Sequence, residues 1–206
     1  MRKVKCFDDE FDFSKPYTVI NGGLKPIETD RITGTVDKCE DLDYKFRYRR
    51  WGNIKEEYRR KELEKASKEY TIFSPIQVIR YKNEYYVIDG NRRVALAKEQ
   101  NVDYIDAYIT DYVDDDNREE MDAVLLRRRF DVETNLSYVS LTNGKGYELL
   151  LEEIYDFSDD DDVKEKAKKW KSEWFLPFCE AIKRSVLSEE YPRLRTEDIY
   201  VLISSF

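Results

Sequence analysis

Residues 76–109 carry the clearest alternation of apolar and polar positions in the chain. Ile76 and Val78 are followed by the run Tyr85–Ile88, and both groups are rich in β-branched or aromatic residues. The polar residues of Tyr81–Glu84 separate them, which is typical of a strand, a hairpin turn and a second strand.

A helix and a third strand are predicted to follow. Gly90 ends the second strand, and Asn91 is expected to cap a helix that runs to about Asn101. Tyr104–Ile109 then alternates again and predicts the third strand. The order strand, turn, strand, helix, strand indicates a small α/β (α+β) unit. The predicted buried face of the helix consists of Val94, Leu96 and Ala97.

The C-terminal half reads as mainly helical. Helices are predicted over Arg118–Phe130, from about Tyr147, over Val163–Leu187 and from Thr196, the third interrupted by Pro177. Trp170 and Trp174, four residues apart within it, are expected in a helix core.

The first part of the chain lacks such a pattern. Residues 1–33 are expected to form an irregular arm with a short strand near Thr18–Ile20. An exposed helix is predicted over Ile54–Tyr70, where opposite charges recur at helical spacing. We therefore expect an arm over 1–33, an α/β domain over 34–113 and a helical domain over 114–206.

Composition limits the kinds of catalytic and metal site that the chain can form. The 206 residues include no histidine, which excludes Ser-His-Asp and Cys-His nucleophile systems and histidine-ligated zinc. The three cysteines, Cys6, Cys39 and Cys179, are far apart and odd in number, so neither a thiolate metal site nor a disulfide framework is expected. Without an apolar leader or an apolar run of about 18 residues, the sequence predicts a cytoplasmic protein in a reducing compartment, with no membrane partner.

Charge is unevenly distributed within a net charge of −8. Tyr44–Lys68 contains ten basic and four acidic residues, whereas Asp111–Asp162 contains seventeen acidic and five basic ones. The aspartate runs at 114–116 and 159–162 are interpreted as solvated linkers, because they lack the ligand spacing of a calcium loop. Asn143–Gly146 lacks the spacing of a phosphate loop and is interpreted as a helix-initiating turn.

The segment from Asp89 to Arg93 carries the candidate chemistry. A buried strand enters a glycine turn, and the helix that follows begins with two arginines. The N-terminus of a helix attracts anions, and a guanidinium matches phosphate oxygens. Asp89 is suited to hold Mg²⁺ or to accept a proton from an attacking hydroxyl. An ordinary Asp-Gly turn with surface arginines is an equally good interpretation of these residues alone.

Residues 34–112 resemble the ParB/sulfiredoxin superfamily. The resemblance rests on Ser74–Val78, Tyr85–Ile88, Asp89–Arg93 and Ile105–Thr110. Within the superfamily the chain is most similar to bacterial proteins of unassigned role with a D-G-N-H-R-V motif. Their other shared elements are matched by Gly34-Thr35-Val36, by Trp170 and Trp174, and by the segment Arg195–Tyr200. The resemblance implies a small mixed sheet with helices, followed by a helical region.

The resemblance also restricts the activity. Sulfiredoxins have a G-C-H-R loop, and Asn91 stands here at the cysteine, so peroxiredoxin repair by that chemistry is excluded. The G-E-R-R loop of ParB is matched by Gly90, Arg92 and Arg93, whereas Asn91 replaces the glutamate linked to CTP hydrolysis. Serine kinases on this fold share Asp89, Gly90 and Arg93 but use a histidine that this chain lacks.

These comparisons predict a nucleoside triphosphate site that binds ATP or CTP with Mg²⁺. The predicted phosphate-binding residues are Gly90, Asn91, Arg92 and Arg93, and Asp89 is the predicted metal ligand. If the protein is an enzyme, phosphoryl transfer or slow hydrolysis would use Asp89 and Arg92 as catalytic residues. Because an arginine replaces a titratable histidine, binding is favoured over turnover.

The alternative is a non-enzymatic regulator or nucleic-acid-binding protein with a degenerate site. Tyr44–Trp51 interleaves aromatic and basic residues, a combination that stacks on bases and neutralises phosphates, although it also suits an amphipathic edge. The residues predicted to contact DNA, RNA or a protein partner are Arg47, Arg49, Arg50, Arg59 and Arg60.

Overall fold

The computed structural model describes residues 3–49, 74–136, 139–192 and 194–205. Contacts divide the chain into an N-terminal unit, Met1–Asp116, and a helical unit, Asn117–Phe206. The predicted helix over Ile54–Tyr70 lies outside the described residues.

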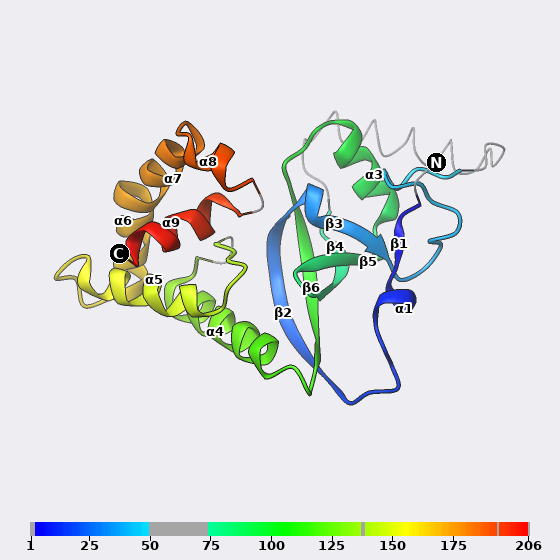
Figure 1. Ribbon diagram of the computed structural model, residues 1–206, viewed down its shortest axis with the longest axis horizontal. Coiled ribbons are helices and arrows are strands. Elements are labelled where there is room, and N and C mark those ends of the chain that lie inside the picture. The colour runs from blue at the N-terminus through cyan, green and yellow to red at the C-terminus, as the bar shows by residue number, and fades with distance from the viewer. Residues whose placement is uncertain (1–2, 50–73, 137–138, 193, 206) are drawn as a thin grey trace. The chain divides into compact units, whose positions relative to one another are not determined.

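The N-terminal unit is built on a six-stranded mixed sheet in the order β1-β3-β5-β4-β6-β2 (Figure 1). Its bounds are β1 Lys5–Cys6, β2 Tyr17–Glu28, β3 Ile32–Thr35, β4 Ile76–Tyr81, β5 Glu84–Asp89 and β6 Tyr104–Asp114, with α1 Phe7–Glu10, η1 Thr29–Arg31 and α3 Asn91–Glu99 between them. The parallel pairs are β1 with β3, β3 with β5, and β4 with β6; β5 with β4 and β6 with β2 are antiparallel. The predicted α/β fold, with a helical region after it, is thereby confirmed.

The two faces of the sheet bury different side chains. Ile76 and Val78 of β4 belong to the core that Val94 and Ala97 of α3 complete. Ile79 and Tyr81 of the same strand point to the opposite face, where they pack with aromatic residues of the N-terminal segment. This separation follows from the two-residue period of a strand.

The expectation of an irregular arm over 1–33 is wrong, because these residues supply β1, α1, β2 and η1. β2 pairs with β6 from Tyr17 to Glu28, and the two long ribbons lie side by side in Figure 1. Asn21-Gly22-Gly23 lies within β2, where the register with β6 is irregular between Asn21 and Gly23. Pro26 is tolerated because β2 forms an edge of the sheet.

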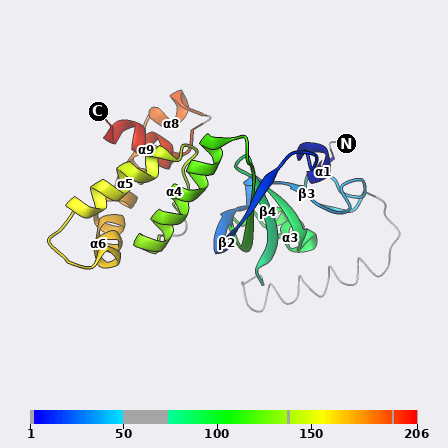
Figure 2. The same cartoon turned by 90° about the horizontal axis from the view of Figure 1, so that it is seen from below.

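The helical unit contains its own core. Its elements are α4 Arg118–Thr134, α5 Lys145–Asp156, α6 Val163–Trp170, the π-helical turn η2 Lys171–Phe175, α7 Leu176–Lys183, α8 Leu187–Glu190 and α9 Thr196–Ser204. α4 and α5 lie side by side in both views (Figure 1 and Figure 2). Glu153 of α5 accepts hydrogen bonds from Trp170 Nε1 at 3.2 Å and from the Tyr200 hydroxyl at 2.6 Å, and so connects α5 with α6 and α9.

The long helix predicted over Val163–Leu187 is interrupted before Pro177, at the π-helical turn. Trp170 is buried and stacks on Phe175 at 4.6 Å between ring centroids. Trp174 is 50% exposed, so the prediction that both tryptophans lie in the core is wrong for Trp174. The wider π turn changes the angular spacing that a continuous α-helix would give these two residues.

Candidate functional site

The candidate site is the junction where β5 passes directly into α3. Gly90 occupies the N-cap position with φ +117°, a conformation that side chains other than glycine rarely adopt. A Cβ atom on Gly90 would lie 2.5 Å from Cγ2 of Ile76, so the backbone packs against β4. Gly90 is therefore required both by its dihedral angle and by close packing.

Asn91 does not cap the helix, contrary to the prediction. It is the first residue of α3, and the cap position, held by Gly90, has no side-chain hydrogen bond. The first helical hydrogen bond runs from the Val94 N–H to the Gly90 carbonyl at 3.0 Å. The N–H groups of residues 91–93 therefore have no acceptor within the helix, which is the usual origin of anion affinity at a helix N-terminus.

Arg93 connects three parts of the junction. Its Nη1 donates to the Ser74 carbonyl at 2.9 Å and to the Pro75 carbonyl at 2.6 Å. Its Nη2 donates to Oδ2 of Asp89 at 2.6 Å. The Arg93 side chain is only 18% exposed, whereas that of Asp89 is 69% exposed. The geometry thus assigns Arg93 a role in holding the junction together, in addition to any contact with a ligand.

The remaining predicted residues lie at the same place. Arg92 is half-buried on the first turn of α3. Oδ1 of Asn91 is buried and has no hydrogen-bond partner among the residues that the structure describes. The structure therefore brings all five residues, Asp89 to Arg93, into one short segment with Ser74 and Pro75 beside it.

A metal ion at this junction would have Asp89 as its ligand. Within residues 3–49, 74–136, 139–192 and 194–205, no group of three or more His, Cys, Asp or Glu side chains is arranged to hold a metal. Mg²⁺ is commonly held by one or two carboxylates together with substrate phosphates, so Asp89 fits that requirement only with a bound nucleotide. Its ion pair with Arg93 would compete for the metal.

The second predicted site lies on the loop after β3. Asp43 is buried and accepts hydrogen bonds from the backbone N–H groups of Lys45, at 2.8 Å, and Arg47, at 3.0 Å. The Arg47 guanidinium also donates to it, with Nε 2.9 Å from Oδ2. Burial raises the pKa of the Asp43 carboxyl, but these hydrogen bonds outweigh burial and hold the pKa below its usual range.

Some residues of this loop that are predicted to contact nucleic acid are exposed to solvent. Tyr44 is exposed, with Nζ of Lys45 5.7 Å from the centroid of its ring. Arg47 is partly committed to Asp43, and Nη1 of Arg49 lies 3.4 Å from the Glu40 carbonyl. Arg50, Arg59 and Arg60 lie outside the described residues.

Sequence reasoning missed a buried ion pair in the sheet. Nη2 of Arg80 donates to Oδ2 of Asp111 at 2.8 Å, and both side chains are buried. β6 extends past the predicted strand end at Ile109 to include Asp111 and Asp114, so the interpretation of 114–116 as a solvated linker is wrong for Asp114. The parallel register places Arg80 beside Asp111, a relation that neither residue's local sequence reveals.

Sequence reasoning also missed a disulfide. Cys6 and Cys39 are bonded, with their Cα atoms 5.4 Å apart, so the expectation of no disulfide is wrong. The two cysteines are 33 residues apart in the sequence, and only the parallel pairing of β1 with β3 brings the two chain segments together. Cys179 is a buried free cysteine, and burial raises the pKa of its thiol to about 12.

Two further expectations have clear outcomes. Asn143–Gly146 immediately precedes and begins α5, which confirms a helix-initiating turn. No helix among the described residues has both the length and the apolar composition needed to cross a membrane.

Comparison with known proteins gives no family assignment for this chain, because neither the protein-family models nor the curated proteins searched contain a match. The resemblance to the ParB/sulfiredoxin superfamily stays a prediction.

Proposed function

We propose that the N-terminal unit binds the phosphate groups of a nucleoside triphosphate at the β5–α3 junction. The observation that carries this proposal is the direct passage from β5 through Gly90, at φ +117°, into a helix without a side-chain cap. The first N–H groups of α3, which have no acceptor within the helix, and the positive end of the helix dipole then face an anion together with Arg92. ATP or CTP are the ligands that the resemblance to the ParB/sulfiredoxin superfamily implies.

The residues have distinct roles in this proposal. The backbone of Gly90 and Asn91 surrounds the phosphate oxygens, and Arg92 pairs with them. Arg93 acts as a positioning residue, because its contacts with Ser74, Pro75 and Asp89 fix the strand relative to the helix. Asp89 holds Mg²⁺ jointly with the phosphates, which requires that the metal compete with Arg93 for the carboxylate.

We favour nucleotide binding over phosphoryl transfer or slow hydrolysis as the function of this site. A general base has to accept a proton from the attacking hydroxyl, and the Asp89 carboxylate already accepts a hydrogen bond from Arg93. The chain has no histidine to take that role. As an enzyme, the protein would therefore need Asp89 to leave its ion pair, with Arg92 stabilising the developing charge.

The test is calorimetric titration of the full chain with ATP, CTP and GTP, each with and without Mg²⁺. We expect Arg92→Gln to weaken binding of the preferred triphosphate by about tenfold to a hundredfold, the value of a charge-assisted hydrogen bond of about 1.5–3 kcal/mol. Lys15→Gln removes an equal charge from an exposed position outside the junction and should bind as the wild type does.

Two results would overturn the proposal: no heat of binding with any triphosphate, or an Arg92→Gln protein whose affinity equals that of the wild type. Production of diphosphate at a steady rate would instead favour the enzymatic form of the site.

A second candidate function is single-stranded nucleic-acid binding by the Asp43–Arg49 loop. It is favoured by the exposed Tyr44 ring with Lys45 beside it, on a loop that Asp43 holds in place. Aromatic stacking contributes about 1–3 kcal/mol per base. A mobility shift with single-stranded DNA that weakens with salt and is lost in Tyr44→Ala would support this function, whereas a shift unchanged by that substitution would contradict it.

A further inference from the structure

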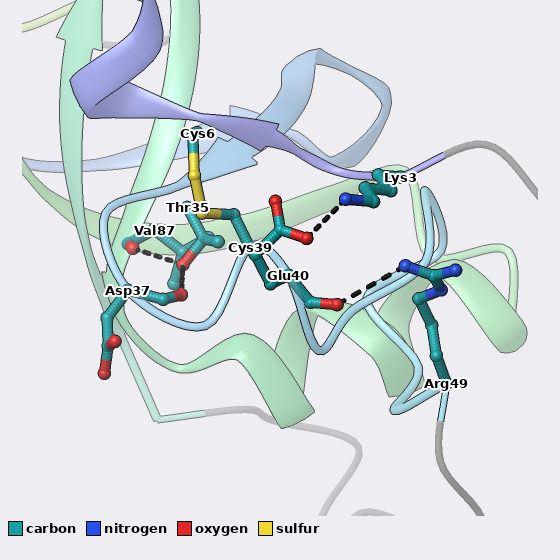
Figure 3. The surroundings of a disulfide bond; sticks show 8 residues. All are labelled: Lys3, Cys6, Thr35, Asp37, Cys39, Glu40, Arg49 and Val87. Carbon is teal, nitrogen blue, oxygen red and sulfur yellow. Dashed lines mark hydrogen bonds and ion pairs between the residues drawn. A yellow bond between two sulfur atoms is a disulfide. The ribbon is translucent and has the colours of Figure 1, made fainter.

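The Cys6–Cys39 disulfide joins the N-terminal segment to the loop that follows β3. Cys6 is the last residue of the two-residue strand β1, and Cys39 lies four residues after the end of β3 (Figure 3). Both cysteines are half-buried. The disulfide is therefore only partly enclosed, unlike Cys179, which is buried in the helical unit.

Noncovalent contacts also hold the N-terminal segment, Lys3–Phe11, against this loop, where buried Val4 shares a core cluster with Leu42 and Phe46. Lys3 forms a largely exposed ion pair with Glu40 (Figure 3). The backbone of Lys3 also forms an isolated bridge with Asp43. β1 pairs with β3 through only two positions, Lys5 with Gly34 and Cys6 with Thr35. Exposed ion pairs contribute little to stability and a two-residue parallel pairing is short, so the disulfide is stronger than the polar contacts between this segment and the loop.

The segment held in this way covers an aromatic face of the sheet. Phe7 and Phe11 are buried, and the centroid of the Phe7 ring lies 5.2 Å from that of Tyr86. The Phe11 ring lies 5.0 Å from Tyr81 and 5.4 Å from Tyr112. If the N-terminal segment left, these tyrosines and the edge of β3 would be exposed to solvent.

We propose that the disulfide is a redox-controlled clamp that keeps the N-terminal segment over this aromatic face. In the reducing step a dithiol transfers two electrons and two protons to the Cys6–Cys39 bond. The bond breaks to two thiols, and the dithiol closes to a cyclic disulfide. In a compartment that thiols keep reducing, a disulfide is mostly transient and redox-sensing.

The clamp acts because the Cys6–Cys39 bond closes a loop of the chain. This loop restricts the conformations of the N-terminal segment after it leaves the sheet. Cross-linking residues 33 apart removes much of the conformational freedom that the N-terminal segment would gain on leaving the sheet. Reduction restores that freedom while the remaining contacts are unchanged. The open state is therefore populated more after reduction, and the aromatic face is the surface that becomes available.

Alkylation of the full chain under denaturing conditions, followed by intact mass measurement, tests whether the bond exists. Protein purified without reductant should take up one alkyl group, on Cys179, and reduced protein should take up three. Three groups without reductant would overturn the proposal.

Hydrogen exchange then tests the clamp. On reduction, amide exchange in residues 3–11 should rise by about tenfold or more, with little change in β4 and β6. Cys39→Ser, which leaves β1 intact, should exchange like reduced protein and no longer respond to a dithiol. Cys179→Ser should respond as the wild type does. Equal exchange in the oxidised and reduced wild type would overturn the clamp, as would a Cys39→Ser protein that still responds.

Discussion

At the scale of single residues, the buried charge of Asp43 is stabilised by hydrogen bonds from neighbouring residues of its own loop. Its carboxylate accepts bonds from two backbone N–H groups and one guanidinium within four residues. The folded state therefore favours the ionised carboxyl, and the pKa of Asp43 lies below its value of about 3.9 in an unfolded chain. Its stabilising contribution is complete above that unfolded value and is lost as the pH falls through the folded pKa.

Asp43→Asn should lower the free energy of unfolding at pH 7 by about 1–3 kcal/mol, because the ion pair with Arg47 is lost. The difference from the wild type should begin to shrink below about pH 4, where the carboxyl of the unfolded chain takes up a proton, and should be lost as the pH falls through the lower folded pKa. Urea denaturation at several pH values measures both effects. Asp41→Asn, an exposed carboxylate of the same loop, is the control and should change stability by less than about 0.5 kcal/mol. A difference that stays constant down to pH 3 would contradict this account.

At the scale of elements, the conformation of the β5–α3 junction depends on Gly90. Gly90 combines a positive φ with a close contact to Ile76, while Gly23 of β2 has φ +74° and no atom within 4 Å of the place that a Cβ would occupy. Substituting each glycine by alanine therefore separates two contributions to the loss of stability. Both substitutions introduce backbone strain, and only the one at Gly90 adds steric overlap with a buried β-branched side chain. The overlap involves β4, so the effect reaches beyond the junction itself.

Gly23→Ala should destabilise the protein by about 1–2 kcal/mol through backbone strain alone. Gly90→Ala should cost about 1–3 kcal/mol more, because a core around Ile76 has to shift. Thermal unfolding of the two variants followed by circular dichroism measures the difference. Equal losses for the two substitutions would show that the contact with Ile76 is unimportant.

At the scale of the whole molecule, the buried side chains form separate cores. The aromatic and aliphatic cluster that contains Trp170 draws its buried members only from residues 130–200. The two clusters on the sheet draw theirs only from residues 4–109. Each unit thus has an apolar core of its own among the described residues, which is the property that allows a domain to fold alone.

A fragment comprising residues 117–206 should therefore unfold cooperatively, with a free energy of about 5 kcal/mol. Urea denaturation followed by far-ultraviolet circular dichroism and by tryptophan fluorescence should give coincident transitions, because Trp170 lies in the core. If the circular dichroism signal of the fragment falls gradually from the lowest urea concentration, with no folded baseline, the helical unit needs the N-terminal unit in order to fold.

Local sequence was sufficient for the elements around the candidate site. The strands β4 and β5, helix α3 and strand β6 follow from the period of apolar positions and from Gly90, and all lie close to their predicted places. The loop from Asp89 to Arg93 was predictable for the same reason, since its residues are neighbours in the sequence. Periodicity and turn chemistry are local properties, so they can be read without knowing the fold.

Tertiary structure decided the features that depend on distant partners. The contacts of Arg93 with Ser74 and Pro75, the pairing of Arg80 with Asp111 and the disulfide of Cys6 with Cys39 all join residues at least 18 positions apart. The place of β2 at the sheet edge likewise depends on β6, more than 70 residues later. Such relations arise from strand order and register, which the period of a single segment leaves undetermined. The sequence by itself therefore determined which residues form the candidate site, and the fold decided that Arg93 holds the site together.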